Sequence, residues 1–297
     1  MKLRYTLDVL FGDAQKDEYP LESHISDEEH DIIRISIKEE KKNNHSRLSL
    51  IVVPKYQKIS TGKYLSTFKR LTSPLYKGYL INLKTYSYKE DYLKKHFSAR
   101  TRNRFRARNK KLEQCVQPKS QMYYGAIHKP TYDLLFEHFP NMLEKRFDQK
   151  EEINFEIPYI PIYEEVFFSL VQEKRACIYA KFDDGIPICM SISFIYGKTL
   201  ILYDSGYDVD YEAFNLGHLI MIEHIDWCLK NKFKRIDLCR GDFYHKRKWM
   251  NDNYTYHQID FFKPTYMIAT INSLKDWFVN HIRFNTISFL KKMKFHK

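Results

Sequence analysis

The sequence predicts a mixed fold of the α/β (α+β) class, and three observations support this prediction. Short runs in residues 1–85 alternate apolar and polar side chains, which is the period of a half-buried strand. Three further strand-like runs lie between residues 176 and 205, and a helix-length segment and another short strand follow them. Residues 88–114 and 268–295 contain neither Pro nor Gly and space their apolar residues as helices do.

The elements before residue 85 are expected to be strands. An alternating run extends from Leu3 to Phe11, and similar runs follow at 32–37, 48–53 and 79–83. Acidic or Lys/Asn-rich stretches at 26–31 and 39–44 separate these runs and indicate exposed turns. Residues 1–85 therefore predict a strand-rich lobe.

The next elements are expected to be mainly helical. Residues 88–114 predict one long helix with a narrow apolar stripe. Residues 130–146 and 161–172, each opened by a proline, predict two more helices. A strand is expected at 122–127 and a loop at 148–158.

Residues 176–238 show the clearest local signals. Strands at 176–182 and 188–196 are joined through Asp183-Asp184-Gly185, which is a strong hairpin signal. A third strand at 199–205, a helix at 216–229 and a strand at 235–238 complete the series. The tail predicts an amphipathic helix that packs on the core, with an apolar face formed by Ile271, Leu274, Phe278, Ile282 and Phe289. The alternative is a basic membrane-surface helix over Ser273 to Lys297.

Length and cysteine content argue against several classes of protein. A chain of 297 residues can bury a core without a disulfide or metal staple. Its five cysteines are an odd number without a C-x-x-C pair, which favours reduced thiols over a zinc site or a disulfide framework. The sequence lacks a recognisable signal segment and an apolar run of membrane-spanning length. We therefore expect a cytoplasmic protein without a metal, at most peripheral to the inner membrane.

The net charge of +12 is unevenly distributed. Residues 1–40 hold 5 Lys/Arg against 11 Asp/Glu, which leaves a net charge of +18 on the remainder. Such a field attracts polyanions, including nucleic acid, anionic lipid headgroups, coenzyme A phosphates and acidic carrier proteins. It selects none of them.

Asn215 and Gly217 mark a candidate anion site at the start of the helix predicted over 216–229. Asn215 suits the N-cap position, and Gly217 lets a ligand approach the backbone. The free N–H groups and the helix dipole favour a phosphate there. Most Asn-x-Gly entries are ordinary helix caps, so the position directly after the strand series is what favours a binding role.

A second candidate site is the run of acids, bases and a phenol from Asp237 to Trp249. It follows a predicted strand, and strand ends are where α/β proteins collect functional side chains. Tyr244 and His245 can exchange protons, an aspartate can orient or accept them, and Lys246 can stabilise developing negative charge. The alternative interpretation is a salt-bridged turn followed by a solvated basic helix.

A third candidate is the series of arginines at every second position from Arg100 to Arg108. No acidic residue lies between residues 94 and 111. On a helix this spacing divides the arginines between two faces. The pattern is compatible with polyanion binding and also with a solvated helix that covers an acidic neighbour.

Four segments between residues 95 and 250 resemble the CelD/BcsL-type acetyltransferase domain, a GNAT relative similar to Fem-type aminoacyltransferases. They are the Arg-rich helix at 98–113, the hairpin at 180–187, the stretch from 203–208 to Leu216-Gly217-His218-Leu219, and the run from Asp237 through Gly241-Asp242 to Trp249. The family reads G-D-x-x-Y-K-x-x-W in the last segment. This chain keeps that spacing but has His245 in place of the tyrosine, Tyr244 one position earlier, and Leu216 where the family often has proline.

The resemblance implies a GNAT acyltransferase fold with acyl-CoA bound between the strands at 199–205 and 235–238. It implies an acyltransferase domain at 86–265, a degenerate GNAT half at 1–85 and a C-terminal helix at 266–297. The implied cofactor-binding residues are Tyr203, Ser205, Asn215, Leu216, Gly217 and His218. The implied catalytic residues are Asp204, Asp242, Tyr244, His245 and Lys246. The implied substrate-binding residues are Arg100, Arg104, Asp237, Arg240 and Trp249.

We therefore expect an N-acyltransferase that moves an acyl group from acyl-CoA, or from acyl carrier protein, to an amine of a small-molecule, sugar or lipid precursor of the cell envelope. One alternative is a tRNA-dependent aminoacyltransferase of Fem type, which the basic body of the chain favours. Another is a non-catalytic GNAT scaffold that binds a polyanion or a partner. No motif specifies the acyl chain length, the acceptor or the oligomeric state.

Overall fold

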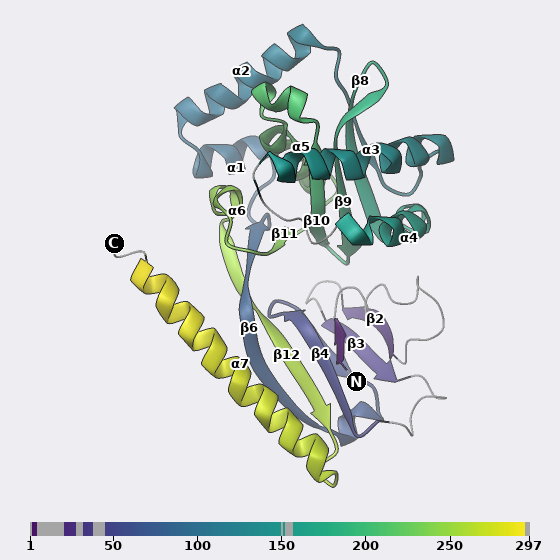
Figure 1. Ribbon diagram of the computed structural model, residues 1–297, viewed down its shortest axis with the longest axis vertical. Coiled ribbons are helices and arrows are strands. Elements are labelled where there is room, and N and C mark those ends of the chain that lie inside the picture. The colour runs from purple at the N-terminus through teal and green to yellow at the C-terminus, as the bar shows by residue number, and fades with distance from the viewer. Residues whose placement is uncertain are drawn as a thin grey trace. The chain divides into compact units, whose positions relative to one another are not determined.

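The computed structural model describes residues 2–4, 21–27, 32–37, 45–149, 151 and 157–294. The chain divides into two compact units, whose elements are labelled in Figure 1. Unit 1 comprises Met1–Tyr79 and Asn253–Lys297, and unit 2 comprises Leu80–Asp252.

Unit 2 is built on an antiparallel meander. Its helices are α1 (Lys89–His96), α2 (Ala99–Cys115), α3 (Lys129–Asp148), α4 (Ile160–Gln172), α5 (Leu216–Lys230) and α6 (Tyr244–Trp249), with 3-10 helices η5 (Ile157–Tyr159) and η6 (Val209–Phe214). Its strands are β7 (Lys119–Tyr123), β8 (Ala176–Asp183), β9 (Ile186–Tyr196), β10 (Thr199–Tyr207) and β11 (Arg235–Arg240), in the spatial order β11-β10-β9-β8-β7. Strands β7 to β10 pair antiparallel, and β11 pairs parallel to β10. The predicted series of three strands, a helix and a strand is confirmed.

Strand β9 shows how the sheet receives helices on both faces. Its residues alternate between the faces, as the two-residue period requires. Phe194 packs against Phe167 of α4, with ring centroids 4.9 Å apart. Ser191 points to the opposite face, where its hydroxyl lies 3.0 Å from Nε2 of His224 in α5. Both faces are therefore buried, which explains why nearly all of β9 is inaccessible to solvent.

The turns of the meander agree with their sequence signals. Asp184 and Gly185 both have positive φ, at 45° and 84°, as the tight hairpin between β8 and β9 requires. Strand β7 begins three residues before the predicted start at residue 122. The helices predicted at 130–146 and 161–172 are confirmed as α3 and α4.

The single helix predicted over 88–114 is wrong, because the chain breaks between α1 and α2. Phe97 is extended, and its ring packs against Phe105 at 5.4 Å and Trp249 at 4.7 Å between centroids. Ser98 then starts α2 as its N-cap, accepting a hydrogen bond from the Thr101 amide at 3.3 Å. Tertiary packing of one aromatic ring therefore interrupts a pattern that is helical throughout.

Unit 1 carries two groups of strands and the C-terminal helix. Its elements are β1 (Lys2–Arg4), β2 (Leu21–Asp27), β3 (Ile32–Ile37), β4 (Arg47–Pro54), β5 (Lys58–Thr61), η4 (Leu65–Thr67), β6 (Lys69–Asn82), β12 (Asp252–Phe262) and α7 (Met267–Lys294). Strands β1, β4, β12 and β6 are neighbours in that order, and β2, β3 and β5 form a second sheet. The last residues of β6 and the first of β12 belong to unit 2.

The strand-rich character expected of residues 1–85 is confirmed where the chain is described. Predicted strands at 32–37 and 48–53 are confirmed as β3 and β4, and β6 is longer than the run at 79–83. Strands β2, β5 and β12 were not predicted, and β2 occupies two residues of a predicted turn. Most of the run from Leu3 to Phe11, the turn at 39–44 and part of the loop at 148–158 lie outside the described residues.

Helix α7 is confirmed as a helix, but its apolar face does not pack on the core as expected. The predicted apolar face is exposed, with exposed fractions between 51% for Leu274 and 62% for Phe289. The helix contacts strands of unit 1 through polar side chains instead. Asp276 forms an ion pair with Arg47 at 2.7 Å, and Asn280 donates to Ser73 Oγ at 2.9 Å.

Candidate functional site

A cavity of about 380 Å³ lies in unit 2 where β10 and β11 end and α5 begins. We call it the strand-end cavity. The register of β10 with β11 ends at Ile201 and Asp237, although both strands continue beyond these residues. Side chains from α3, β10, α5, β11 and α6 line the cavity: Arg146, Phe147, Leu202, Tyr203, Asp204, Ser205, Tyr207, Asn215, Gly217, His218, Ile220, Met221, Leu238, Phe243, Tyr244, His245, Lys246 and Trp249.

The strand-end cavity brings together most of the residues singled out in the sequence. Those lining it are Tyr203, Asp204, Ser205, Asn215, Gly217, His218, Tyr244, His245, Lys246 and Trp249. Those outside its lining are Arg100, Arg104, Leu216, Asp237, Arg240 and Asp242. Segments separated by some 40 residues in the chain therefore meet at one place.

The amino end of α5 leaves room for a ligand at Gly217. A Cβ added at Gly217 would meet only the Tyr207 ring, at 3.8 Å, which is an ordinary contact. The amides of Asn215 and His218 donate to the carbonyls of Glu212 at 2.8 Å and Asn215 at 3.0 Å, which leaves those of Leu216 and Gly217 as the first-turn donors of α5. The glycine therefore opens a cradle of amide donors beside the cavity, which fits a phosphate or a similar anion.

Asn215 and Leu216 form the helix start with side chains in different environments. Asn215 occupies the N-cap position, but its backbone is left-handed, with φ 59°, and its side chain makes no capping hydrogen bond. The expected capping role is therefore wrong, and what this conformation provides is the turn from η6 into α5. Leu216 is fully buried in a cluster with Leu112 and Tyr179, so its side chain serves the core.

His218 is held as a neutral ring in the cavity wall. Its Nδ1 accepts a hydrogen bond from Trp249 Nε1 at 3.1 Å, and its Nε2 lies 3.0 Å from Lys248 Nζ. Burial, aided by the positive charges of Lys248 and Arg108, lowers the pKa of His218 to about 4. Phe105 of α2 packs beside this pair, 5.7 Å from the Trp249 ring and nearly parallel to it.

Asp204 is the carboxylate in the cavity lining, whereas Asp242 and Asp237 are engaged outside it. Oδ1 of Asp204 accepts the Ser205 amide at 2.7 Å. Asp242 forms an ion pair with Arg247 at 3.2 Å. Asp237 is 1% exposed and accepts the Cys239 amide at 2.8 Å, which stabilises the end of β11. The geometry therefore favours Asp204 as the acid or base nearest a ligand.

Lys246 of α6 also lines the cavity. Its Nζ donates to the Arg240 carbonyl at 2.6 Å. Burial lowers the pKa of Lys246, against the opposing attraction of Cys239, Asp237 and Asp204. Arg240 thus contributes its carbonyl, and no role for its guanidinium in the cavity is seen. Tyr244 lines the cavity but is 78% exposed, so most of the residue faces solvent.

Arg146 is a lining residue that the sequence did not reveal. It comes from the last turn of α3, and its Nη1 donates to the Ser205 carbonyl at 2.6 Å. Its guanidinium also lies 5.0 Å from the centre of the Tyr207 ring. A cation in the last turn of a helix is common for electrostatic reasons, so no sequence signal distinguished this one.

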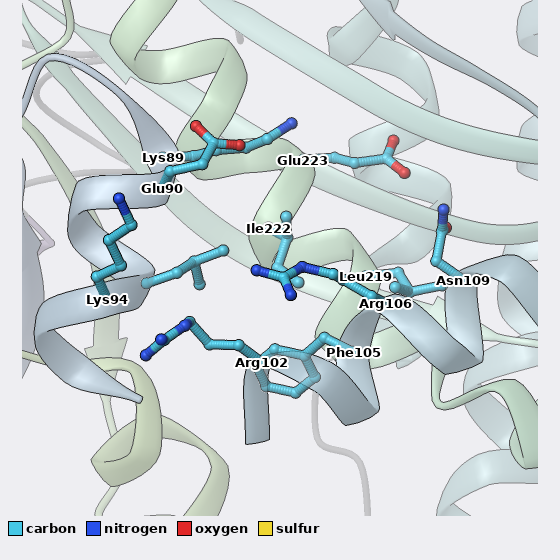
Figure 2. Close-up of a pocket in the computed structure, with 11 residues that line it drawn as sticks. Lys89, Glu90, Lys94, Arg102, Phe105, Arg106, Asn109, Leu219, Ile222 and Glu223 are labelled. Carbon is cyan, nitrogen blue, oxygen red and sulfur yellow. The ribbon is translucent and has the colours of Figure 1, made fainter. Parts of the chain in front are cut away.

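A second cavity of about 290 Å³ lies among α1, α2 and α5, and we call it the helix groove (Figure 2). Its floor is apolar, with Leu93, Phe105, Leu219 and Ile222. Its rim carries the cations Lys89, Lys94, Arg102 and Arg106, together with Glu90, Asn109 and Glu223. Glu223 is engaged by Lys181 Nζ at 2.9 Å and by the Tyr179 hydroxyl at 2.7 Å. The groove therefore presents a basic rim above an apolar floor.

The arginines of α2 divide between two faces, as their spacing predicts. Arg102 and Arg106 line the helix groove. Arg104 and Arg108 lie near Lys248, whose pKa is lowered by burial and then by these two charges. Arg100 lines neither the strand-end cavity nor the helix groove, so its expected place in a substrate site is not seen there.

Three further features of the described part of the chain bear on cofactors and membranes. All five cysteines are free thiols. Among residues 2–4, 21–27, 32–37, 45–149, 151 and 157–294, no group of three or more His, Cys, Asp or Glu could hold a metal ion. None of the helices described there combines the length and apolar character needed to cross a bilayer.

Several solved structures are similar to this chain. The crystal structure of FemX matches with a TM-score of 0.52 at 9% identity, over 79% of this chain and 81% of that chain. A conserved protein of unknown function from Bacteroides thetaiotaomicron matches with a TM-score of 0.48 at 9% identity, over 78% and 79%. L-PGS from Bacillus licheniformis matches with a TM-score of 0.45 at 9% identity, over 83% and 82%. At such identities the likeness is one of fold alone, and only the FemX match is close enough to support that statement.

Comparison of the sequence with protein families agrees with the geometry of unit 2. No curated protein matches the chain. The family model described as "Acetyltransferase (GNAT) domain" matches residues 99–247, which is half of the chain and includes α2, the meander and both walls of the strand-end cavity. The α/β class and GNAT fold expected from the sequence are thereby confirmed, and the chain belongs to the acetyltransferase (GNAT) domain family.

Proposed function

We propose that this protein is an N-acyltransferase that takes its acyl group from acyl-CoA and binds it in the strand-end cavity. The supporting observation is the end of β10–β11 pairing beside the amide cradle at Gly217. Parting strands expose backbone amides and carbonyls that a pantetheine-like chain can pair with, and the amino end of α5 suits its phosphates.

The residues that would hold the donor come from β10 and α5. The amides of Leu216 and Gly217 would bind the pyrophosphate, because those of Asn215 and His218 already donate to the carbonyls of Glu212 and Asn215. Tyr203 and Ser205 would lie along the acyl arm. Bound acyl-CoA supplies an acyl group activated as a thioester. Arg146 holds the Ser205 carbonyl, so it is a positioning residue for this wall of the cavity.

The reaction we propose is direct transfer to an acceptor amine. Asp204 would accept or orient the amine proton, because it is the carboxylate in the cavity lining. Lys246 would stabilise developing negative charge, and Tyr244 or His245 would return a proton to the leaving sulfur. Asp242 stays a candidate only if its ion pair with Arg247 opens.

The finer family position and the acceptor are further parts of this proposal. The segments from 180–187 to Trp249 support membership of the CelD/BcsL-type subgroup and, with it, an amine of an envelope precursor as acceptor. Acyl carrier protein is retained as a second donor. We also retain the expected division into a strand-rich lobe at 1–85, an acyltransferase domain at 86–265 and a C-terminal helix at 266–297.

A tRNA-dependent aminoacyltransferase of Fem type is the second candidate, and the helix groove favours it. Lys94 of α1 and Arg102 and Arg106 of α2, the helix that opens the matched domain, form a basic rim (Figure 2). Such a rim can neutralise phosphates of a nucleic acid, with binding that weakens steeply as salt rises. A non-catalytic GNAT scaffold is the third candidate, and it predicts no turnover with either donor.

Thermal stability of the full chain with three ligands separates these candidates. Acetyl-CoA, a long-chain acyl-CoA and bulk aminoacylated tRNA are added in turn, because a ligand that prefers the native state raises the melting temperature. We expect a shift with a CoA ester. A shift with tRNA alone would favour the Fem-type function, and no shift with any ligand would favour the scaffold.

A further inference from the structure

Helix α7 turns polar side chains towards unit 1 and apolar side chains away from it, which is the reverse of a helix packed on a water-soluble domain. Its inward face carries Ala269, Ser273, Asp276 and Asn280, while its large apolar residues point outward. Asp276 binds Arg47 at 2.7 Å and Lys2 at 2.8 Å, and its carboxylate accepts Gln258 Nε2 at 3.2 Å. These polar contacts to strands of unit 1 fix which face of the helix points away. Figure 1 shows α7 running beside β6 and β12, with which it shares hydrogen bonds.

The outward face is apolar along the length of the helix. Its exposed large residues are Met267, Ile268, Ile271, Leu274, Phe278, Val279, Ile282, Phe289, Leu290 and Met293. They form the greater part of the exposed large apolar residues in the described chain. A contiguous face of this kind marks a surface that contacts another apolar phase, because isolated exposed residues are common but long stripes are not.

The charges on α7 indicate which apolar phase its outward face contacts. Lys275 and Arg283 are exposed, and the helix sequence also contains Lys291, Lys292 and Lys294. Its single acid is Asp276, which is engaged on the inward face. On a helical projection the outward face therefore carries the ammonium of Lys275 and, among its described residues, no acid, which is complementary to an anionic lipid surface.

The position of Lys275 favours a bilayer over a second copy of the chain. On a helical projection it lies among Ile271, Phe278 and Ile282, within the apolar face. At a bilayer surface its stem can lie on the acyl chains while its ammonium reaches the phosphates. In a symmetric dimer two such lysines would be desolvated near each other with no acid on either face to pair with them.

We propose that α7 is an interfacial helix that binds the surface of an anionic phospholipid bilayer and lies in the plane of that surface. At 28 residues it is roughly 40 Å long, and its exposed apolar stripe faces one way. Interfacial helices combine a large apolar face with cations in this manner. This inference does not depend on the acyl-transfer chemistry proposed for unit 2, because it rests on residues of unit 1.

Vesicle co-flotation of the full chain tests the inference. We expect binding to vesicles that contain phosphatidylglycerol and weaker binding to pure phosphatidylcholine. Added salt should weaken the binding to the anionic vesicles, because it screens the electrostatic attraction. Phe278→Ser with Ile282→Ser should lower the partition coefficient at least about hundredfold, since each removes a large apolar side chain from the interface. Both side chains are more than half exposed, so the double variant should fold normally.

Matched controls distinguish binding through the outward face of α7 from nonspecific adsorption to vesicles. Ile186→Ser removes an apolar side chain that is 58% exposed on the β8–β9 hairpin, and it should leave flotation unchanged. Lys275→Glu should weaken binding to the anionic vesicles at least about tenfold, whereas Lys63→Glu, an exposed lysine elsewhere in unit 1, should not.

Two results would overturn the inference. One is wild-type protein that stays unbound to phosphatidylglycerol vesicles at low salt. The other is a dimer in sedimentation velocity that Phe278→Ser dissociates while vesicle binding is absent, because a second copy would then cover the face.

Discussion

Gly217 offers the most direct test of the donor site, through substitution with leucine. The backbone of Gly217 lies outside the positive-φ region, and an added Cβ meets only Tyr207 at 3.8 Å. The fold should therefore accept a larger residue, and helix propensity should even add up to about 1 kcal/mol over glycine. The leucine side chain would instead extend into the cavity of about 380 Å³ beside the first-turn amides.

We expect Gly217→Leu to weaken the binding of acetyl-CoA without lowering the stability of the free protein. We expect Gly217→Leu to raise the Kd for acetyl-CoA at least about hundredfold, which corresponds to about 2.7 kcal/mol. At a ligand concentration of a hundred times the wild-type Kd, the stabilisation of about 2.7 kcal/mol should fall to a few tenths. Melting curves with and without acetyl-CoA, followed by titration calorimetry, measure both quantities.

Two variants control this experiment. Gly217→Ala adds only the Cβ and should keep most of the ligand-induced shift. Ala213→Leu adds a similar side chain at an exposed position of η6 outside the cavity lining and should keep all of it. If Gly217→Leu kept the full acetyl-CoA shift, the ligand would not pass over the amino end of α5, and the proposed donor site would be wrong.

Three further predictions follow from the described contacts. Asp204→Asn should lower kcat/KM by about 100- to 10,000-fold with little change in acetyl-CoA affinity, whereas Asp242→Asn should cost less than about tenfold; steady-state kinetics of both variants decides which carboxylate acts. His218 has a pKa near 4 in the folded protein against 6.5 ordinarily, so the unfolded chain binds more protons between these values and stability should fall as pH decreases from about 6.5 to 4. Because the ring is partly exposed, we expect the free energy of unfolding to fall by about 1–2 kcal/mol over this pH range. Urea unfolding at several pH values should show that the free energy of unfolding of His218→Gln changes less steeply with pH over the same range. Gly78→Ala should destabilise unit 1 by about 1–3 kcal/mol in the same assay, because its Cβ would overlap the buried ring of Tyr254; an unchanged midpoint would show that the ring can move away.

The meander and its following helix were predictable because their signals are local. The Asp184-Gly185 turn requires positive φ, and these residue types tolerate it, so sequence and structure coincide there. Strand β12 was missed because it buries polar residues. Gln258 and Asp260 are 3% and 1% exposed, and their partners Arg47 and Asp276 are distant in the chain, so the apolar alternation of a strand is broken.

The candidate site was predictable in its residues and less so in their roles. Strand ends and a helix start place Asp204, Gly217 and Lys246 together whatever the details of the chain between them. Their roles depend on which polar groups are already engaged, and no spacing rule records that. Arg247 pairs with Asp242, and Trp249 holds His218 neutral, through contacts that only the folded chain creates.

The same distinction explains the error at α7. A sequence pattern shows that a helix has an apolar face, but it does not show which face the protein binds. Here the inward face is selected by Asp276 and Asn280, whose partners Arg47 and Ser73 lie on strands far from α7 in the chain, while Gln258 lies on the strand that precedes it. Apolar patterning predicts burial only when water is the sole alternative environment, so an exposed apolar face held outward by ion pairs is evidence of a second environment.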